Sequence, residues 1–132
     1  MVQVSVTAAV KVAGGPSLPL SLSLDPKSYT LSSVSLAKAG DTTGEDRDTE
    51  KVPLPAGTMV LLAMKVTSTA TGKPAQVEAE LMTGKTITVS DSLLIASASL
   101  LTHLLPVTGK REVTLTNTGE AVTVEILTCR TA

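Results

Sequence analysis

The segment VTLTNTGEAVTVEIL, from Val113 to Leu127, contains two short runs in which apolar and polar residues alternate. The runs are separated by Asn117–Gly119. Alternation with a period of two is the pattern of a β-strand that buries one face. Asn and Gly supply the positive-φ positions that a tight turn between two strands requires. The segment therefore predicts a β-hairpin.

The same alternation recurs along most of the chain and defines the fold class. Pro19 places the second of these strands at the edge of a sheet, because proline cannot donate to a central ladder. Short strands separated by turn residues are typical of a sandwich or a barrel. We therefore expect one all-β domain over residues 1–132, an antiparallel β-sandwich or jelly-roll-like barrel of about 8 strands. The other predicted strands are residues 2–12, 18–24, 29–36, 77–81 and 86–89.

The most apolar strand candidate is TMVLLAMKV, Thr58–Val66, which is apolar at both parities from Met59 to Met64. A half-exposed strand would alternate, so we expect this one to be buried on both faces and to form a hairpin with residues 77–81. One face would meet the core. The other would meet either a covering segment of the same chain or a neighbouring subunit.

Residues 90–105 fit two structures. Ser90 or Asp91 could cap a helix, which gives one short helix near residues 91–104. Serines within the segment and the strands on either side favour two short strands, or a strand and a bend. An apolar run of this length cannot be assigned by periodicity alone, and we favour the strands.

The composition limits both the core and the partners. Among 132 residues, 42% are apolar, but Tyr29 is the only aromatic residue. A core of small aliphatic side chains buries little surface per residue, so association between copies is a natural way to bury more. The 11 Lys and Arg residues are scattered and the net charge is −1. Contacts to nucleic acid need clustered basic residues and stacking aromatics, so we expect no nucleic-acid partner.

No apolar run is long enough to span a membrane, and residues 1–15 lack the pattern of a signal peptide. We therefore expect a soluble protein that is made in the cytoplasm and has no membrane partner. Cys129 is the only cysteine, which excludes a disulfide within the chain and a cysteine-rich metal site. We interpret it as a small buried or near-terminal apolar residue, with an intermolecular disulfide as the alternative.

Residues for catalysis are scarce. His103 is the only histidine, and it lies between leucines. The chain has no G-x-S-x-G elbow and no glycine-rich phosphate loop. We expect no enzyme activity, no catalytic residue and no cofactor.

The longest polar stretch, residues 37–57, is a predicted loop that carries five carboxylates within ten residues. Carboxylate oxygens suit Ca²⁺, but the spacing does not match the known Ca²⁺ loop, and Arg47 and Lys51 dilute the charge. A solvated loop is the favoured interpretation, no metal site is predicted, and Ca²⁺ binding stays open. The carboxylates belong to Asp41, Glu45, Asp46, Asp48 and Glu50.

Two segments, PAGTMVLLAMKV and VTLTNTGEAVTVEILTC, together make up about a fifth of the chain. In their class they resemble the small β-sandwich virion proteins of tailed bacteriophages, such as head-decoration (cement) proteins and minor structural proteins. The resemblance implies a location in the virion, assembly through protein–protein contacts and no cofactor. The implied partners are further copies of the chain and other virion proteins.

From this we predict a structural protein that contacts other subunits through the apolar strand and the long loop. The alternative is a binding or adhesion module that recognises a ligand or receptor through its loops and is monomeric. The residues predicted to form or flank the subunit contact are Met59, Leu61, Met64, Asp41, Glu45, Arg47, Pro53 and Pro55.

Overall fold

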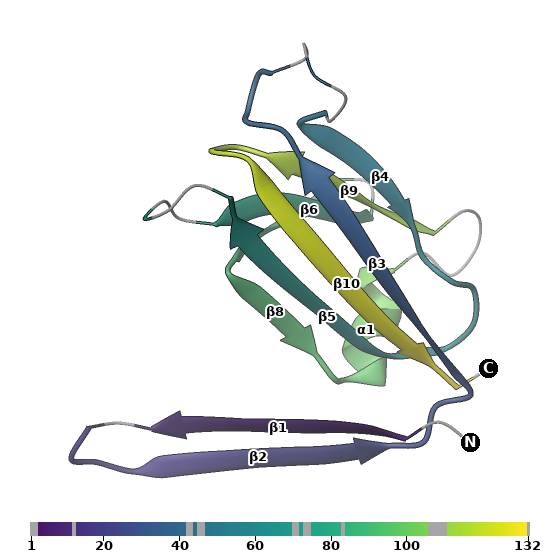
Figure 1. The fold of residues 1–132 in the computed structure, drawn as a ribbon. Helices are drawn as coiled ribbons and strands as arrows, with labels where there is room; N and C mark the ends of the chain where they lie inside the picture. The colour runs from purple at the N-terminus through teal and green to yellow at the C-terminus, as the bar shows by residue number, and fades with distance from the viewer. Residues whose placement is uncertain are drawn as a thin grey trace.

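The computed structural model describes residues 3–11, 13–41, 44, 47–69, 72, 75–82, 84–105 and 111–131. The described residues are mostly β-structure, with one short helix, as the alternating sequence predicts (Figure 1). The elements are β1 (Val4–Lys11), β2 (Ser17–Leu24), β3 (Ser28–Leu36), β4 (Thr49–Pro53), β5 (Met59–Ser68), β6 (Gln76–Met82), β7 (Lys85–Ser90), β8 (Ser92–Ile95), α1 (Ala98–Leu104), β9 (Glu112–Asn117) and β10 (Val122–Arg130).

Eight of the strands form a sandwich of two four-stranded antiparallel sheets. The first sheet has the order β3-β10-β5-β8, and the second has the order β4-β9-β6-β7. Along the chain, each strand from β4 to β10 lies in the opposite sheet of the sandwich from the strand before it, with the single exception of the β6–β7 pair. Two sheets connected in this way form a jelly roll. The predicted fold class is confirmed.

The core lies between the two sheets, and its described members are aliphatic side chains and methionines. Its buried members are Leu, Val, Met, Ala and Ile residues, contributed by both sheets and by α1. Val124 and Ile126 of the first sheet and Val113 and Leu115 of the second are fully buried, so the alternation seen in the sequence correctly predicts which side chains face inward.

The predicted hairpin over residues 113–127 is wrong, because β9 and β10 belong to different sheets. The turn between them carries the chain across the sandwich. Asn117 is buried there, and its Nδ2 donates hydrogen bonds to the carbonyls of Ala37 and Glu120, both at 2.7 Å. Its Oδ1 accepts one from the Gly119 amide at 3.0 Å. Neither Asn117 nor Gly119 has a positive φ, so the turn is not of the hairpin type.

The predicted hairpin of β5 with β6 is wrong for the same reason, since these strands also lie in opposite sheets. The predicted loop over residues 37–57 also contains a strand, β4, which pairs with β9. In β4 only Val52 is buried, and the other four residues are exposed. A strand with a single inward side chain among polar residues gives no periodicity to detect.

Residues 90–105 contain both a strand and a helix. The favoured interpretation is confirmed for β8 and is wrong for residues 98–104, where the alternative of a short helix is confirmed. The predicted caps are also wrong. Ser97 caps α1, since its hydroxyl accepts a hydrogen bond from the Leu100 amide at 3.2 Å. Asp91 instead has a φ of 63° and forms the sharp turn from β7 to β8.

Candidate interaction surface

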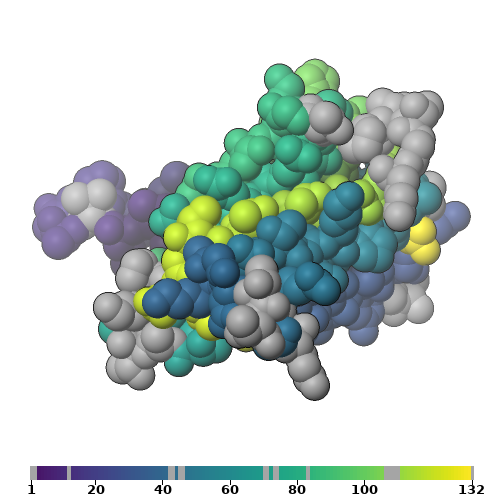
Figure 2. Space-filling model, turned by 90° about the horizontal axis from the view of Figure 1, so that it is seen from above, coloured from purple at the N-terminus to yellow at the C-terminus, as the bar shows by residue number. Residues whose placement is uncertain are grey.

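Two strands stand apart from the sandwich. β1 and β2 pair with each other in a separate two-stranded sheet, which we call the arm. The arm runs below the sandwich in Figure 1. Figure 2 shows its outer end, in purple, reaching beyond the body of the molecule. Pro19 lies in this sheet, where both strands are edges, in agreement with the predicted edge position.

The arm has one apolar and one polar face. Its register places serines and threonines opposite one another on the polar face, for example Ser5 opposite Ser23 and Thr7 opposite Ser21. The residues between them point to the other side of the ribbon. The cross-strand pairs of the apolar face are Val4–Leu24, Val6–Leu22, Ala8–Leu20 and Val10–Leu18.

Burial of the apolar face decreases from the root of the arm to its tip. Leu24 at the root is half-buried, whereas Leu22 is 36%, Leu20 51% and Leu18 58% exposed. Val10, opposite Leu18, is exposed to a similar extent. The outer half of the arm therefore presents an aliphatic surface to solvent.

The root of the arm is fixed to the sandwich. Pro26 is buried, and the Lys27 amide donates to the Arg130 carbonyl at 2.9 Å. The Arg130 side chain returns to β3, where its Nε donates to the Ser28 hydroxyl at 2.6 Å. The arm is thus attached at one end and unsupported at the other.

The middle of the arm does not pack tightly against the sandwich. A cavity of about 230 Å³ lies between its apolar face and Leu94 and Ala96 at the end of β8. Protein interiors contain few voids larger than a water molecule. The arm therefore lies over the end of β8 without filling the space beneath it. The residues of the arm that line the cavity are Val6, Ala8, Leu20, Ser21 and Leu22.

The outer face of the first sheet carries a second apolar area. In the sheet register, Leu31 of β3 lies beside Leu127 of β10, Ala63 of β5 and Leu94 of β8, which form one row. Tyr29 begins the neighbouring row, next to Cys129. We call Tyr29, Leu31, Ala63, Leu94 and Leu127 the platform. Leu31 is 63% and Tyr29 57% exposed.

The structure places the three predicted contact residues of β5 inside the molecule. Met59, Leu61 and Met64 are all buried. Met64 lies in the core between the sheets, whereas Leu61 points to the outer side, opposite Cys129. The same chain covers all three side chains, so any contact with another subunit has to use their exposed neighbours.

The predicted contact residues of the loop are dispersed. Asp41 and Arg47 are exposed, and the backbone of Arg47 accepts a hydrogen bond from the Ala37 amide. Pro53 ends β4 opposite Glu112, and Pro55 is half-buried. Glu45 lies outside the described residues. The structure does not bring this group together with the apolar residues of β5.

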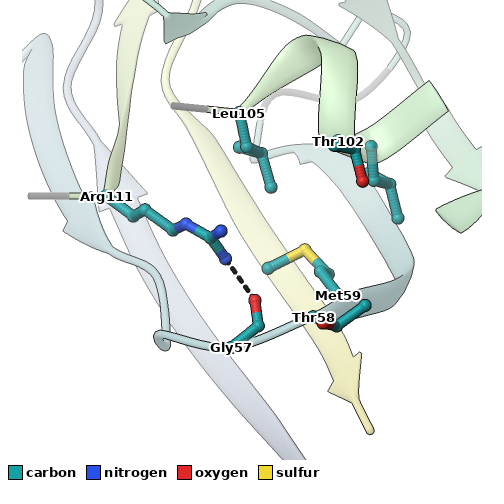
Figure 3. A pocket seen from close by; sticks show the side chains of 7 residues that line it. Gly57, Thr58, Met59, Thr102, Leu105 and Arg111 are labelled. Atoms are coloured by element: carbon teal, nitrogen blue, oxygen red, sulfur yellow. Dashed lines mark hydrogen bonds between the residues drawn. The ribbon is translucent and has the colours of Figure 1, made fainter. Parts of the chain in front are cut away.

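A second cavity, of about 250 Å³, opens beside α1 (Figure 3). Met59, Leu101 and Leu105 form its apolar wall, and Arg111 reaches across it to donate a hydrogen bond to the carbonyl of Gly57. Small-molecule sites usually measure about 300–1,000 Å³. This cavity is smaller, and its described lining residues include one charged side chain and no cluster of convergent polar groups.

The reactive side chains are not assembled into a site. His103 is exposed on α1, and Cys129 is fully buried in β10. Burial raises the pKa of the Cys129 thiol, which disfavours the reactive thiolate. Within the described ranges, no group of three or more His, Cys, Asp or Glu residues could hold a metal ion. No helix in the described part of the chain is long and apolar enough to cross a membrane.

Comparison of the chain with protein-family profiles, with curated proteins and with solved structures finds no match. Function therefore has to be inferred from the geometry of the chain. The exposed leucines of the arm are the residues that the sequence analysis missed as a candidate site. Their alternation predicts the strand, but it does not show whether another segment covers the apolar face.

Proposed function

We propose that this protein is a non-enzymatic building block of a protein assembly and that it acts through protein–protein contacts made by the arm. The observation that carries the proposal is the exposed apolar face of β1 and β2. A hairpin of two strands is marginally stable by itself in water. Contiguous apolar surface of this kind marks an interaction site on a soluble protein.

The distribution of exposed residues supports this choice. Among the residues that the structure describes, eight large hydrophobic residues are exposed, of which four belong to the arm and three to the platform. The remaining one is Leu100 of α1. Exposed apolar residues scattered singly need no explanation, but seven of eight on two surfaces indicate a role in binding.

We further propose that the assembly is a virion, and that the chain is a capsid-decoration or minor structural protein of a tailed bacteriophage. Jelly rolls occur in viral capsid proteins, lectins and cupins, so the fold by itself does not choose between these classes. The resemblance of the β5 and β10 segments to small virion proteins and the exposed arm support the virion. Copies of the chain and other virion proteins are the expected partners. Capsid and tail genes beside its own gene are the expected finding.

The experiment is a measurement of native mass by sedimentation velocity over a wide range of protein concentration. We expect the wild-type chain to form assemblies and Leu20→Lys in the arm to reduce them to single chains. Leu100→Lys is the matched control, since Leu100 is 47% exposed and lies outside the arm and the platform. A wild-type protein that stays a single chain at every concentration would contradict the proposal. So would assemblies that Leu20→Lys leaves unchanged.

A further inference from the structure

We infer that the arm of one copy lies on the platform of a second copy. This inference rests on the proposed function and names the surface that receives the arm. The arm and the platform are two different apolar surfaces of the same chain, so a contact between them joins one copy to the next.

In this structure the arm does not cover the platform of its own chain. Its middle approaches Leu94 of β8, where the cavity of about 230 Å³ remains. Leu31 lies on β3, at the opposite edge of the same sheet, and is the most exposed of the large hydrophobic residues that the structure describes. A second copy can supply the apolar surface that the chain's own arm does not place there.

The arm and the platform are alike in that both apolar surfaces lack charged side chains. Apart from the aromatic ring and hydroxyl of Tyr29, the platform and the apolar face of the arm carry only aliphatic side chains. The next row of the sheet is polar, with Glu125 opposite Ser33 and Lys65. A charged side chain of a partner would be buried against the aliphatic row without a counter-charge, which costs free energy. An aliphatic ribbon can bind the row without this cost.

The available area indicates how many contacts are needed. Each strand of the arm has 8 residues, which at about 3.3 Å per residue gives a length of about 26 Å. With strands about 5 Å apart, the apolar face measures on the order of 300 Å². A stable interface needs roughly 800 Å² from each partner. One arm–platform contact therefore buries only on the order of 300 Å² from each partner and is weak, so assembly depends on each copy giving one arm and receiving another.

The test uses one variant for each surface. Leu20→Lys places a charge on the arm, Leu31→Lys places the same charge on the platform, and Leu100→Lys is the control. Leu20, Leu31 and Leu100 are all substantially exposed, so each variant is expected to fold. Circular dichroism and thermal unfolding check the fold, and sedimentation velocity gives the native mass.

We expect Leu20→Lys and Leu31→Lys each to be single chains, while Leu100→Lys assembles like the wild type. An equimolar mixture of the two defective variants combines one intact arm with one intact platform. At high concentration it should therefore form pairs with one copy of each variant, which neither variant forms alone. This recovery distinguishes an arm–platform contact from an arm–arm contact.

Three results would overturn the inference, and they differ in what they say about the proposed function. If Leu20→Lys abolishes assembly but Leu31→Lys does not, the arm binds elsewhere and the proposed function survives. If the wild type never assembles, both proposals fail. A mixture of the two defective variants that stays entirely monomeric would also count against the arm–platform contact.

Discussion

The strands of the sandwich and of the arm share the same alternating sequence pattern, but their apolar faces differ in burial. In β9 and β10 the alternating apolar residues are fully buried, whereas in β2 the outer leucines are about half exposed. The local sequence of both regions is equally suited to a strand. The difference lies in what faces the apolar side, a second sheet in one case and solvent in the other. Alternation therefore specifies a strand, but only the topology decides whether that strand is core or contact surface.

Alanine substitution should separate the two regions most clearly. Leu115→Ala removes a fully buried side chain of β9, and we expect the free energy of unfolding to fall by about 2–5 kcal/mol. Leu20→Ala in the arm should lower it by less than about 1 kcal/mol, because Leu20 is already largely exposed. Urea denaturation at low protein concentration measures both. Equal losses would show that the arm is part of the cooperative core.

Substitution of Asn117, in the turn between the two sheets, should have the next largest effect on the free energy of unfolding. Asn117→Ala leaves the carbonyls of Ala37 and Glu120 without their amide donor, and we expect a loss of about 1–3 kcal/mol. Thr118→Ala, at the exposed neighbouring position, is the control and should be close to neutral. The same urea experiment applies. A neutral Asn117→Ala would mean that the amide does not stabilise the crossing between the sheets.

The cap of α1 should contribute less. Ser97→Ala removes the hydroxyl that accepts a hydrogen bond from the Leu100 amide, and a loss of about 1 kcal/mol is expected. Ser99→Ala, inside the helix and exposed, should be neutral or slightly stabilising. Thermal unfolding of the two variants makes the comparison. A larger loss for Ser99→Ala would contradict the assigned cap.

The smallest expected effect concerns Cys129, whose pKa is raised above its ordinary value of 9.0 by burial. The folded state holds the thiol proton more tightly than the unfolded state does. Stability should therefore be unaffected below this ordinary value and should fall as the pH rises through it. Urea denaturation of the wild type and Cys129→Ala on both sides of pH 9 tests this sign. A difference between the two proteins that does not change with pH would contradict it.

The sequence predicts the strands well and their partners poorly. Val113, Leu115, Val124 and Ile126 are buried as their spacing predicts, because alternation shows which side chains share a face and the fold places that face between the two sheets. Pairing depends on which sheet a strand joins, and nothing in the local pattern around Asn117 distinguishes a hairpin from a crossing. Strand β4 was missed because Val52 is its only buried residue.

The candidate surface was predictable only in part. The excess apolar side chains on β5 led to the prediction of a subunit contact, but Met59, Leu61 and Met64 are covered within the chain. A short apolar run predicts that a strand is buried, but it does not predict which segment or subunit covers that strand. The arm shows the reverse situation. Its pattern looks like that of an ordinary strand, and its exposure follows from its position outside the two sheets.

Tyr29 gives the protein a built-in optical reporter. It is the only aromatic residue of the chain, so all ultraviolet fluorescence of the aromatic side chains comes from one ring on the platform. In the free chain more than half of that residue is in contact with water. A ligand, an antibody or another subunit that covers the platform would therefore change the emission, and it would do so without any attached dye.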